Sequence, residues 1–216
     1  MQKLNFNKDK LLLYGVTDRS WLKGDTLESQ VEKAILGGIT SIQLREKDLD
    51  HDEFLISAKK VKRITDQYKV PFIINDNVEI ALEVDADGVH IGQSDEDIIQ
   101  ARKKLGRNKI IGVSAHNVLE AIMAEENGAD YIGVGAVFHT NTKSDAGTVS
   151  YETLKEICNR VKIPVVAIGG ITRKNIMKLS GSGIDGVAVI SAIFGEQDIT
   201  KASQEMHLLV RKELFK

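Results

Sequence analysis

The chain has 216 residues, of which 42% are hydrophobic, and this favours one sizeable core. Its 29 Lys and Arg nearly balance 31 Asp and Glu, for a formal net charge of −2, so nothing indicates a nucleic-acid-binding or membrane-surface protein. The one cysteine, Cys158, excludes an intrachain disulfide framework and is interpreted as a small packing residue. No run approaches the ~20 apolar residues of a membrane span, and residues 1–10 lack a signal-peptide core, so we expect a cytoplasmic protein.

Short apolar runs alternate with longer amphipathic stretches along the chain. The runs predict eight strands, at 11–16, 40–44, 71–74, 88–91, 110–113, 131–134, 165–168 and 186–189. Their continuous apolar character is typical of parallel strands buried on both faces. The stretches between them predict helices at 27–36, 52–68, 78–82, 95–105, 118–127, 151–160 and 173–179.

Residues with special backbone preferences support these boundaries. Pro71 and Pro164 each open a strand, where a missing N–H is tolerated. Gly37, Gly128 and Gly183 stand where a helix should end. One αβ junction is expected to recur, because three helix-to-strand connections have similar sequences, at 86–89, 129–134 and 184–187.

Eight strand–helix units predict a closed (β/α)8 barrel, or TIM barrel, as a single domain over 1–216. We expect the barrel core at about 11–195 and a C-terminal helix at about 196–214. An open doubly wound sheet is the alternative. The first strand, however, leads to residues 17–19 (Thr-Asp-Arg) rather than to the glycine-rich turn of a dinucleotide site.

Cations follow the second predicted strand, and a barrel would gather such residues at one mouth. Side-chain alternation puts Gln43, Arg45 and Lys47 on one side of an extended segment. Arg offers a planar fork to phosphate oxygens and Lys a compact charge, so this part of the rim favours an anion. A solvated loop is the alternative for the two cations.

Carboxylates follow the next two strands. Asn75 and Asp76 come directly after the third strand, and Asp95 lies just beyond the fourth. Mg²⁺ typically takes one or two protein carboxylates and fills its other positions with water and substrate phosphate. Asp76 and Asp95 therefore predict a magnesium site. Alternatively, Asp95 begins a helix, where an acidic residue favours the dipole.

Phosphate-binding candidates follow strands seven and eight, the recurrent phosphate site of these barrels: Gly170, Ile190 and Ser191. Alternatively, Gly170 serves only to form a tight turn. The polar loop after strand six is a binding loop or lid, or else a solvated surface loop, and its candidates are Thr140, Thr142 and Lys143. A second anion site with two carboxylates suggests group transfer with diphosphate as leaving group.

Eight segments closely resemble, in order, motifs of the thiamine phosphate synthase family: 14–18, 43–47, 74–76, 87–93, 112–117, 133–143, 167–171 and 187–191. The resemblance implies a transferase that joins hydroxymethylpyrimidine diphosphate to a thiazole phosphate, carboxylated or not, and releases thiamine phosphate and diphosphate. It implies that the pyrimidine diphosphate is bound by Gln43, Arg45, Lys47, Asn75, Ser114 and Lys143. It implies Mg²⁺ on Asp76 and Asp95, and a thiazole phosphate bound by Thr140, Thr142, Gly170, Ile190 and Ser191.

These residues suit a dissociative substitution through a pyrimidine-methyl cation. The ring stabilises that cation, so no protein nucleophile is needed, and Mg²⁺ with Arg45, Lys47 and Lys143 would neutralise charge on the leaving group. Ser114 is interpreted as a ligand donor, because a nucleophilic pair with His116 is disfavoured. One departure from the family is visible: Ala136 and His139 replace two prolines of its sixth-strand motif, which loosens that loop.

Two other functions remain open. A thiazole tautomerase of the same superfamily would use a His or Glu as proton shuttle, and His90 suits that role, unless it is a satisfied strand-end histidine. The joint presence of both carboxylates and both rim cations argues against it. A non-catalytic phosphate-binding regulator has no extra domain or basic tail in its favour. Only small-molecule partners are expected, and a homo-oligomer is compatible with the sequence.

Overall fold

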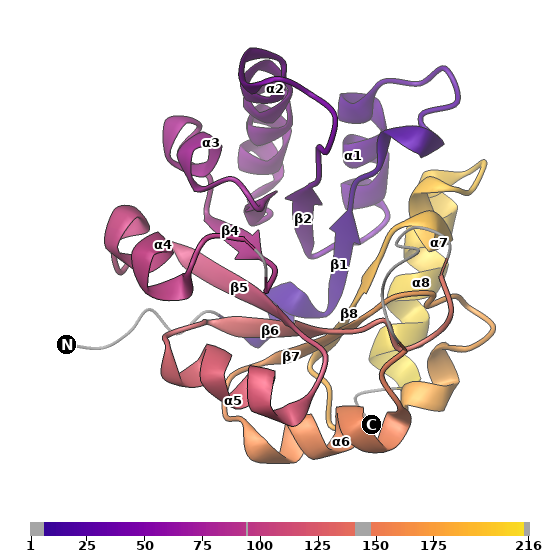
Figure 1. Ribbon diagram of the computed structural model, residues 1–216. Coiled ribbons are helices and arrows are strands. Elements are labelled where there is room, and N and C mark those ends of the chain that lie inside the picture. Colours follow the sequence, from indigo (N-terminus) through magenta and orange to yellow (C-terminus); the bar gives the residue numbers. More distant parts are fainter. Residues whose placement is uncertain (1–6, 94, 141–147, 214–216) are drawn as a thin grey trace.

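The computed structural model describes residues 7–93, 95–140 and 148–213. Eight parallel strands close into a barrel in sequence order, with helices around them (Figure 1). The strands are β1 (Leu13–Val16), β2 (Ser41–Leu44), β3 (Phe72–Asn75), β4 (Gly88–Ile91), β5 (Ile110–Ala115), β6 (Tyr131–Val134), β7 (Val165–Ile168) and β8 (Gly186–Val189). The predicted (β/α)8 barrel is confirmed.

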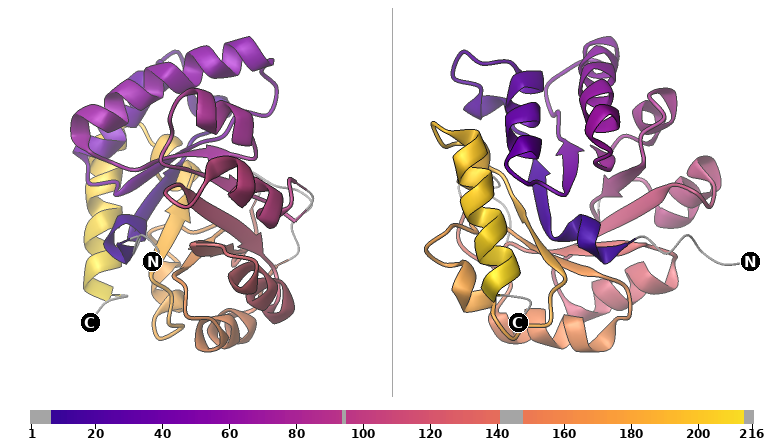
Figure 2. Two further views of the ribbon diagram at one scale, coloured as in Figure 1. Left: turned by 90° about the vertical axis from the view of Figure 1, so that its left-hand side faces the viewer. Right: turned by 180° about the vertical axis from the view of Figure 1, so that it is seen from behind.

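Helices surround the barrel on its outside, and α8 lies beside α1 (Figure 2). The α-helices are α1 (Leu27–Leu36), α2 (His51–Tyr68), α3 (Val78–Glu83), α4 (Ile98–Leu105), α5 (Val118–Glu126), α6 (Tyr151–Arg160), α7 (Ser191–Phe194) and α8 (Ile199–Glu213). Short 3-10 helices are η1 (Lys8–Leu11), η2 (Arg19–Trp21) and η3 (Ile176–Leu179). Across the part of the chain that the structure describes, no helix has both the length and the apolar character needed to cross a membrane.

Two predicted helices begin later than expected. Helix α4 starts at Ile98 because the Asp97 carboxylate caps it, accepting from the N–H groups of Ile99 and Gln100. Asp95 therefore stands outside the helix, and its interpretation as a helix start was wrong. The predicted helix 173–179 is reduced to η3, because the Asn175 side chain bonds to backbone before it, accepting from the Thr172 N–H and donating to the Gly170 carbonyl.

Smaller differences occur at other element ends. The first strand begins at Leu13, because residues 8–11 form η1 under a cap from the Asn7 side chain. Helix α2 begins one residue early, at His51, where Asp50 accepts from the Glu53 N–H. The C-terminal helix begins at Ile199 rather than 196, and the Asp198 carboxylate accepts from the N–H of residue 201 in its first turn.

The recurring αβ junction is confirmed, and its aspartate explains the recurrence. Asp87 accepts a hydrogen bond from the Phe72 N–H (2.8 Å), and its own N–H donates to the Phe72 carbonyl (2.9 Å). Asp130 makes the same two bonds to Ile111, and Asp185 makes them to Val165. Each aspartate ties the start of its strand to a neighbouring strand and so sets the register there.

Two apolar cores hold the barrel. The larger core lies between the strands and the helices, and Cys158 packs against it. Burial raises the pKa of the Cys158 thiol to about 12, which disfavours the reactive thiolate and agrees with the interpretation as a packing residue. The smaller core fills the barrel itself with Leu11, Tyr14, Val16, Ile73, Tyr131, Val166 and Ala188. Because the interior is filled, a ligand can enter only at the mouth.

Candidate active site

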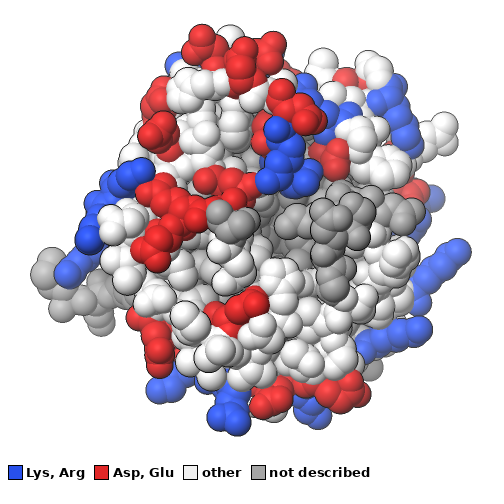
Figure 3. Space-filling view, viewed as in Figure 1, with Lys and Arg blue, Asp and Glu red and all other residues white. Residues whose placement is uncertain are grey.

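A pocket opens at the carboxyl ends of the strands and brings together most of the predicted site. Its lining includes these predicted residues: Gln43, Arg45, Asn75, Ser114, Thr140, Gly170, Ile190 and Ser191. Figure 3 shows the face as a hollow near its centre, with Lys and Arg side chains next to Asp and Glu along its upper edge. Thr142 and Lys143 lie outside the described residues.

Strand register places the polar side chains of neighbouring strands at similar depth. Asn75 is level with His90, and His90 is level with Gly112 on the next strand. Ser114 lies two residues further along, beside Gly133. Because alternate residues of a strand point inward, these side chains share the interior of the mouth. Asn75 is the last residue of β3 and is 9% exposed, so it faces the pocket rather than solvent.

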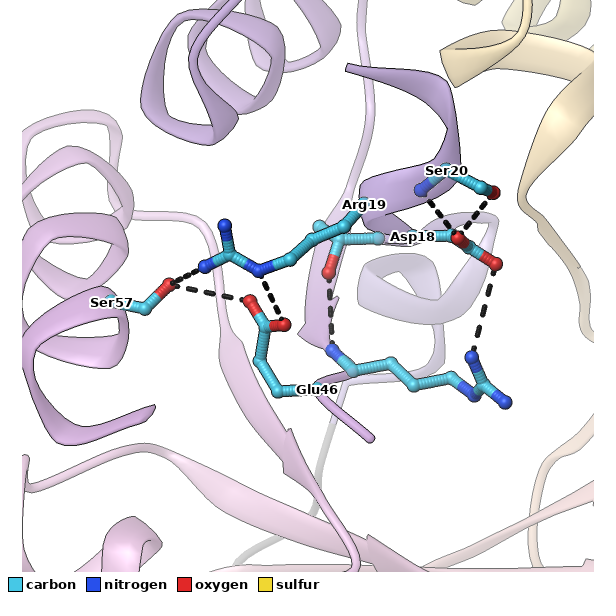
Figure 4. A network of polar contacts seen from close by, with 7 residues as sticks. Asp18, Arg19, Ser20, Glu46 and Ser57 are labelled. Carbon is cyan, nitrogen blue, oxygen red and sulfur yellow. Dashed lines mark hydrogen bonds and ion pairs between the residues drawn. The ribbon is translucent and has the colours of Figure 1, made fainter. Parts of the chain in front are cut away.

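The segment after β2 is held by a network from the loop after β1 (Figure 4). Arg19 donates to the carboxylate of Glu46 at 2.7 Å and to the Ser57 hydroxyl at 3.2 Å. The Glu46 side chain is only 2% exposed, so it points away from the mouth into this network. The side chains before and after it then take the opposite side, as the alternation predicts.

Arg45 is fixed within the same network. Its N–H donates to the Thr17 hydroxyl at 3.1 Å, and its guanidinium lies 3.8 Å from the Asp18 carboxylate. Asp18 itself accepts from the N–H and the hydroxyl of Ser20, at 2.9 and 2.5 Å. The Arg45 side chain is 18% exposed and lines the pocket, so a partly desolvated guanidinium is available to an anion there.

Replacing Arg19 with alanine should weaken both the fold and the anion site. The buried Glu46 carboxylate would lose its charged partner, and we expect a loss of about 1–3 kcal/mol in the free energy of unfolding. Binding of inorganic diphosphate, measured by calorimetry, should also weaken because segment 45–47 loses its anchor. The control is Arg160→Ala, whose pair with Glu156 is 60% and 56% exposed and should matter little. Equal effects of the two substitutions would contradict the anchoring role.

Two carboxylates meet on the neighbouring rim. Asp76 follows β3 in a left-handed conformation (φ 62°), and its N–H donates to the His90 carbonyl at 2.8 Å. Lys47 forms an ion pair with Asp76. Burial and the adjacent Asp76 carboxyl raise the pKa of Asp95, whose carboxylate also accepts from the Gly92 N–H at 2.6 Å. The structure thus brings together the three predicted rim residues Lys47, Asp76 and Asp95.

This donor set fits a magnesium ion. Two carboxylates side by side repel each other, and a divalent cation between them would remove that repulsion. Among the described residues no group of three or more His, Cys, Asp or Glu could hold a metal. A pair is nevertheless what Mg²⁺ requires, because it keeps several waters and takes further oxygens from a phosphate ligand.

The opposite side of the mouth is formed by close backbone approach. Gly170 has a φ of 63°, and a Cβ there would lie 2.4 Å from the His139 carbonyl oxygen and 2.8 Å from that of Phe138. A Cβ at Gly169 would lie 2.5 Å from Ala136. The glycines are therefore required by packing of the loop after β7 against the loop after β6, in addition to any role toward a ligand.

Helix α7 begins at the same side of the mouth. Ile190 is its N-cap residue and makes no side-chain cap hydrogen bond, and Ser191 is its exposed first residue. Both residues line the pocket with Gly170 and Thr140. N–H groups at a helix start suit an anion. The pocket therefore has one anion-favouring side at Arg45 and a second across the mouth at α7.

Two hydrogen bonds of the His90 ring were not predicted from the sequence. Its Nε2 lies 3.0 Å from the Ser114 hydroxyl, and its Nδ1 lies 3.0 Å from the Tyr131 hydroxyl. His116, the sequence neighbour of Ser114, is instead paired with Glu120. The pairing was hidden because Tyr131 stands in a continuously apolar strand. One signal was present in the sequence: Gly112, which pairs with Tyr131 on the next strand, has no side chain and so leaves room for the Tyr131 ring.

Comparison with known proteins agrees with this geometry. The family model described as thiamine monophosphate synthase matches residues 13–193. The chain is 53% identical to a thiamine-phosphate synthase of Clostridium acetobutylicum over 94% of this chain and 97% of that protein. It is 55% identical to the one from Clostridium tetani, over 90% and 93% of the two chains.

Solved structures show the same relationship. A thiamine phosphate pyrophosphorylase from Pyrococcus furiosus superposes with a TM-score of 0.89 at 42% identity, covering 96% of this chain and 98% of that one. An N-acetylmannosamine-6-phosphate 2-epimerase from Clostridium perfringens has a TM-score of 0.67 at 20% identity, covering 93% and 96%, and shares the fold alone. On its matched length, its identity to these relatives and its barrel, the chain belongs to the thiamine monophosphate synthase family.

Proposed function

We propose that this chain works as a thiamine-phosphate synthase, joining hydroxymethylpyrimidine diphosphate to a thiazole phosphate and releasing thiamine phosphate and diphosphate. It is a transferase of thiamine biosynthesis. One observation carries the proposal furthest: a single pocket is lined by Arg45 and Asn75 on one side and by Gly170 and the start of α7 on the other. The Asp76–Asp95 pair lies on the rim directly after Asn75. Two phosphorylated ligands fit such a mouth better than one.

The first step is departure of diphosphate. The bond between the pyrimidine methylene carbon and the diphosphate oxygen breaks, and its electron pair leaves with the oxygen. Arg45 and Lys47 neutralise the charge that grows on that oxygen, and Lys143 adds to them as predicted from its motif. Asp76 and Asp95 would hold Mg²⁺, which when bound supplies further positive charge to the leaving group.

The second step forms the new bond. The thiazole ring nitrogen donates its lone pair to the methylene carbon, and no proton is transferred. Gln43, Asn75 and Ser114 hold the pyrimidine side, while the thiazole phosphate is held across the mouth by Thr140, Gly170, Ile190 and Ser191. Thr142 is assigned to the same phosphate from its motif alone. Holding both partners in one pocket supplies the proximity that the reaction needs. This accounts for a site that works without a nucleophile–base pair.

The tautomerase alternative is weaker, because both ring nitrogens of His90 lie in hydrogen bonds with Ser114 and Tyr131. We further propose a single domain over residues 1–216 that acts on small molecules in the cytoplasm, without nucleic acid or membrane as partner. A homo-oligomer stays compatible with this proposal.

Diphosphate release decides the proposed function. The protein is incubated with each substrate alone and with both, in each case with and without Mg²⁺, and released diphosphate is measured. We expect release only with both substrates and Mg²⁺ present. Isomerisation of the thiazole phosphate alone would favour the tautomerase, and no release under any condition would contradict the proposal.

A further inference from the structure

Five polar side chains inside the mouth form one continuous chain of hydrogen bonds. The Gln43 amide nitrogen donates to the Tyr14 hydroxyl at 3.0 Å. The hydroxyls of Tyr14 and Tyr131 are 2.9 Å apart, and the Tyr131 hydroxyl is 3.0 Å from His90 Nδ1. The other ring nitrogen of His90 is 3.0 Å from the Ser114 hydroxyl. The chain thus starts and ends at residues proposed to bind the pyrimidine diphosphate.

The barrel is built around this chain. A Cβ at Gly112 would lie 2.1 Å from the Tyr131 ring, and one at Gly133 would lie 3.0 Å from the His90 ring. Tyr14 and Tyr131 are 1% and 0% exposed, and their rings meet edge to face at 6.0 Å. Burial raises the pKa of both tyrosines, so both hydroxyls keep their protons. Gly112 and Gly133 therefore leave the space that the Tyr131 and His90 rings occupy.

Such a chain has a direction, because each hydroxyl donates a single proton. The Gln43 nitrogen against Tyr14 leaves the Tyr14 proton to Tyr131. One direction continues this order along the chain: Tyr131 donates to His90 Nδ1, and His90 donates from Nε2 to Ser114. The reverse direction needs the Gln43 amide turned over. Reversing only the bond between the two tyrosines would leave the Tyr14 proton without an acceptor, since within the described residues the Tyr14 hydroxyl bonds to Gln43 and Tyr131 only.

We propose that Tyr14, Tyr131 and His90 are positioning residues that set the hydrogen-bond polarity of Gln43 and Ser114 together. In this polarity Ser114 accepts from His90 and keeps its own proton to donate to a ligand. The Gln43 amide oxygen is left to accept. The diphosphate needs hydrogen-bond donors, and the amino group on the pyrimidine ring needs an acceptor. The proposed direction supplies both, with the Ser114 hydroxyl as donor and the Gln43 oxygen as acceptor. This inference rests on the proposed function for the identity of that ligand.

The tautomer of His90 tests the direction without any assay of activity. Nitrogen-15 NMR of the wild-type imidazoles at neutral pH covers five histidines, and a His90→Gln spectrum identifies the signal of interest. We expect a neutral ring with its proton on Nε2. A proton on Nδ1, or a charged ring, would overturn the proposal. This result stands even if the wild-type protein makes no thiamine phosphate, in which case only the proposed function fails.

Tyr131→Phe tests the coupling. It removes the hydroxyl between Tyr14 and His90, and we expect KM for the pyrimidine diphosphate to rise about 10- to 100-fold, with KM for the thiazole phosphate unchanged. In the nitrogen-15 spectrum of this variant, the His90 signals should no longer show a neutral ring protonated only on Nε2. The control is Tyr68→Phe, which removes a hydroxyl that donates to Glu32 at 2.8 Å on the outer helices.

The two variants separate positioning from stability. A loss of packing alone would change both KM values of Tyr131→Phe together, and that result, or no change in either, would overturn the proposal. If Tyr131→Phe does not fold, the wild-type tautomer decides the question by itself.

Discussion

Asp76→Asn should lower kcat/KM by roughly two to three orders of magnitude, because it removes one of two proposed magnesium ligands, and metal stabilisation of a leaving group contributes several kcal/mol. Asparagine suits the test because it tolerates the left-handed backbone at this position (φ 62°). The apparent Mg²⁺ concentration for half-maximal rate should rise as well. Both quantities come from steady-state diphosphate release at varied Mg²⁺.

The chain supplies a closely matched control. Asp85 also has a left-handed backbone, with a φ of 53°, and also pairs with a lysine, Lys109. It lies in the connection from α3 to β4, at the opposite end of the strands from the mouth. Asp85→Asn should leave the rate and the Mg²⁺ dependence as they are. An Asp76→Asn protein with wild-type rate and Mg²⁺ dependence would remove the metal assignment.

The same substitution should change the electrostatics of the rim. The pKa of Asp95 is raised first by burial and then by the Asp76 carboxyl beside it. Removing the Asp76 charge removes that repulsion, so the Asp95 pKa should fall toward its ordinary range. The substitution also removes the ion pair with Lys47, but that pair is 46% and 25% exposed and contributes little. The variant should therefore lose activity with little change in stability at neutral pH. Repulsion between two neighbouring carboxylates lowers the stability of the folded protein. Such a pair is expected where the two carboxylates bind a cation.

Gly170→Ala should abolish tight binding of the thiazole phosphate, raising its KM by about 100-fold or more. The added methyl group would lie 2.4 Å from the His139 carbonyl oxygen, so the loop after β7 and the loop after β6 cannot keep their contact. A displaced backbone of about 1 Å is enough for such a loss, because phosphate is held by fixed N–H groups. KM for each substrate, measured at saturation of the other, checks the result.

Backbone strain alone has to be separated from displacement of the loop. Gly106 also has a positive φ, 75°, but a Cβ there would meet no atom within 4 Å. Gly106→Ala should therefore lose about 1–3 kcal/mol of stability, because its backbone (φ 75°, ψ −173°) is one that residues with a Cβ rarely adopt, and should keep both KM values. If Gly170→Ala keeps a wild-type KM for the thiazole phosphate, the phosphate is bound elsewhere.

Local features of the sequence predicted the elements well where a single residue decides a boundary. Helices α1 and α6 have the predicted limits, and each begins at a Thr or Ser cap, Thr26 and Ser150. The prediction failed at 173–179, where the Asn175 side chain bonds to its own loop, and at 95, where Asp97 rather than Asp95 caps α4. In both places, which of several polar residues bonds to the backbone depends on the loop conformation.

The sequence by itself predicted the (β/α)8 barrel and the polar residues that follow its strands, because apolar periodicity marks the strands and a closed parallel barrel brings their carboxyl ends together at one mouth. Only the tertiary structure decided which side chains touch. Arg19 holds Glu46 away from the mouth, and His90 bonds to Ser114 and Tyr131. These contacts join different strands or the segments that follow them, and the distance between strands is set by register and packing across the barrel, which no local pattern encodes.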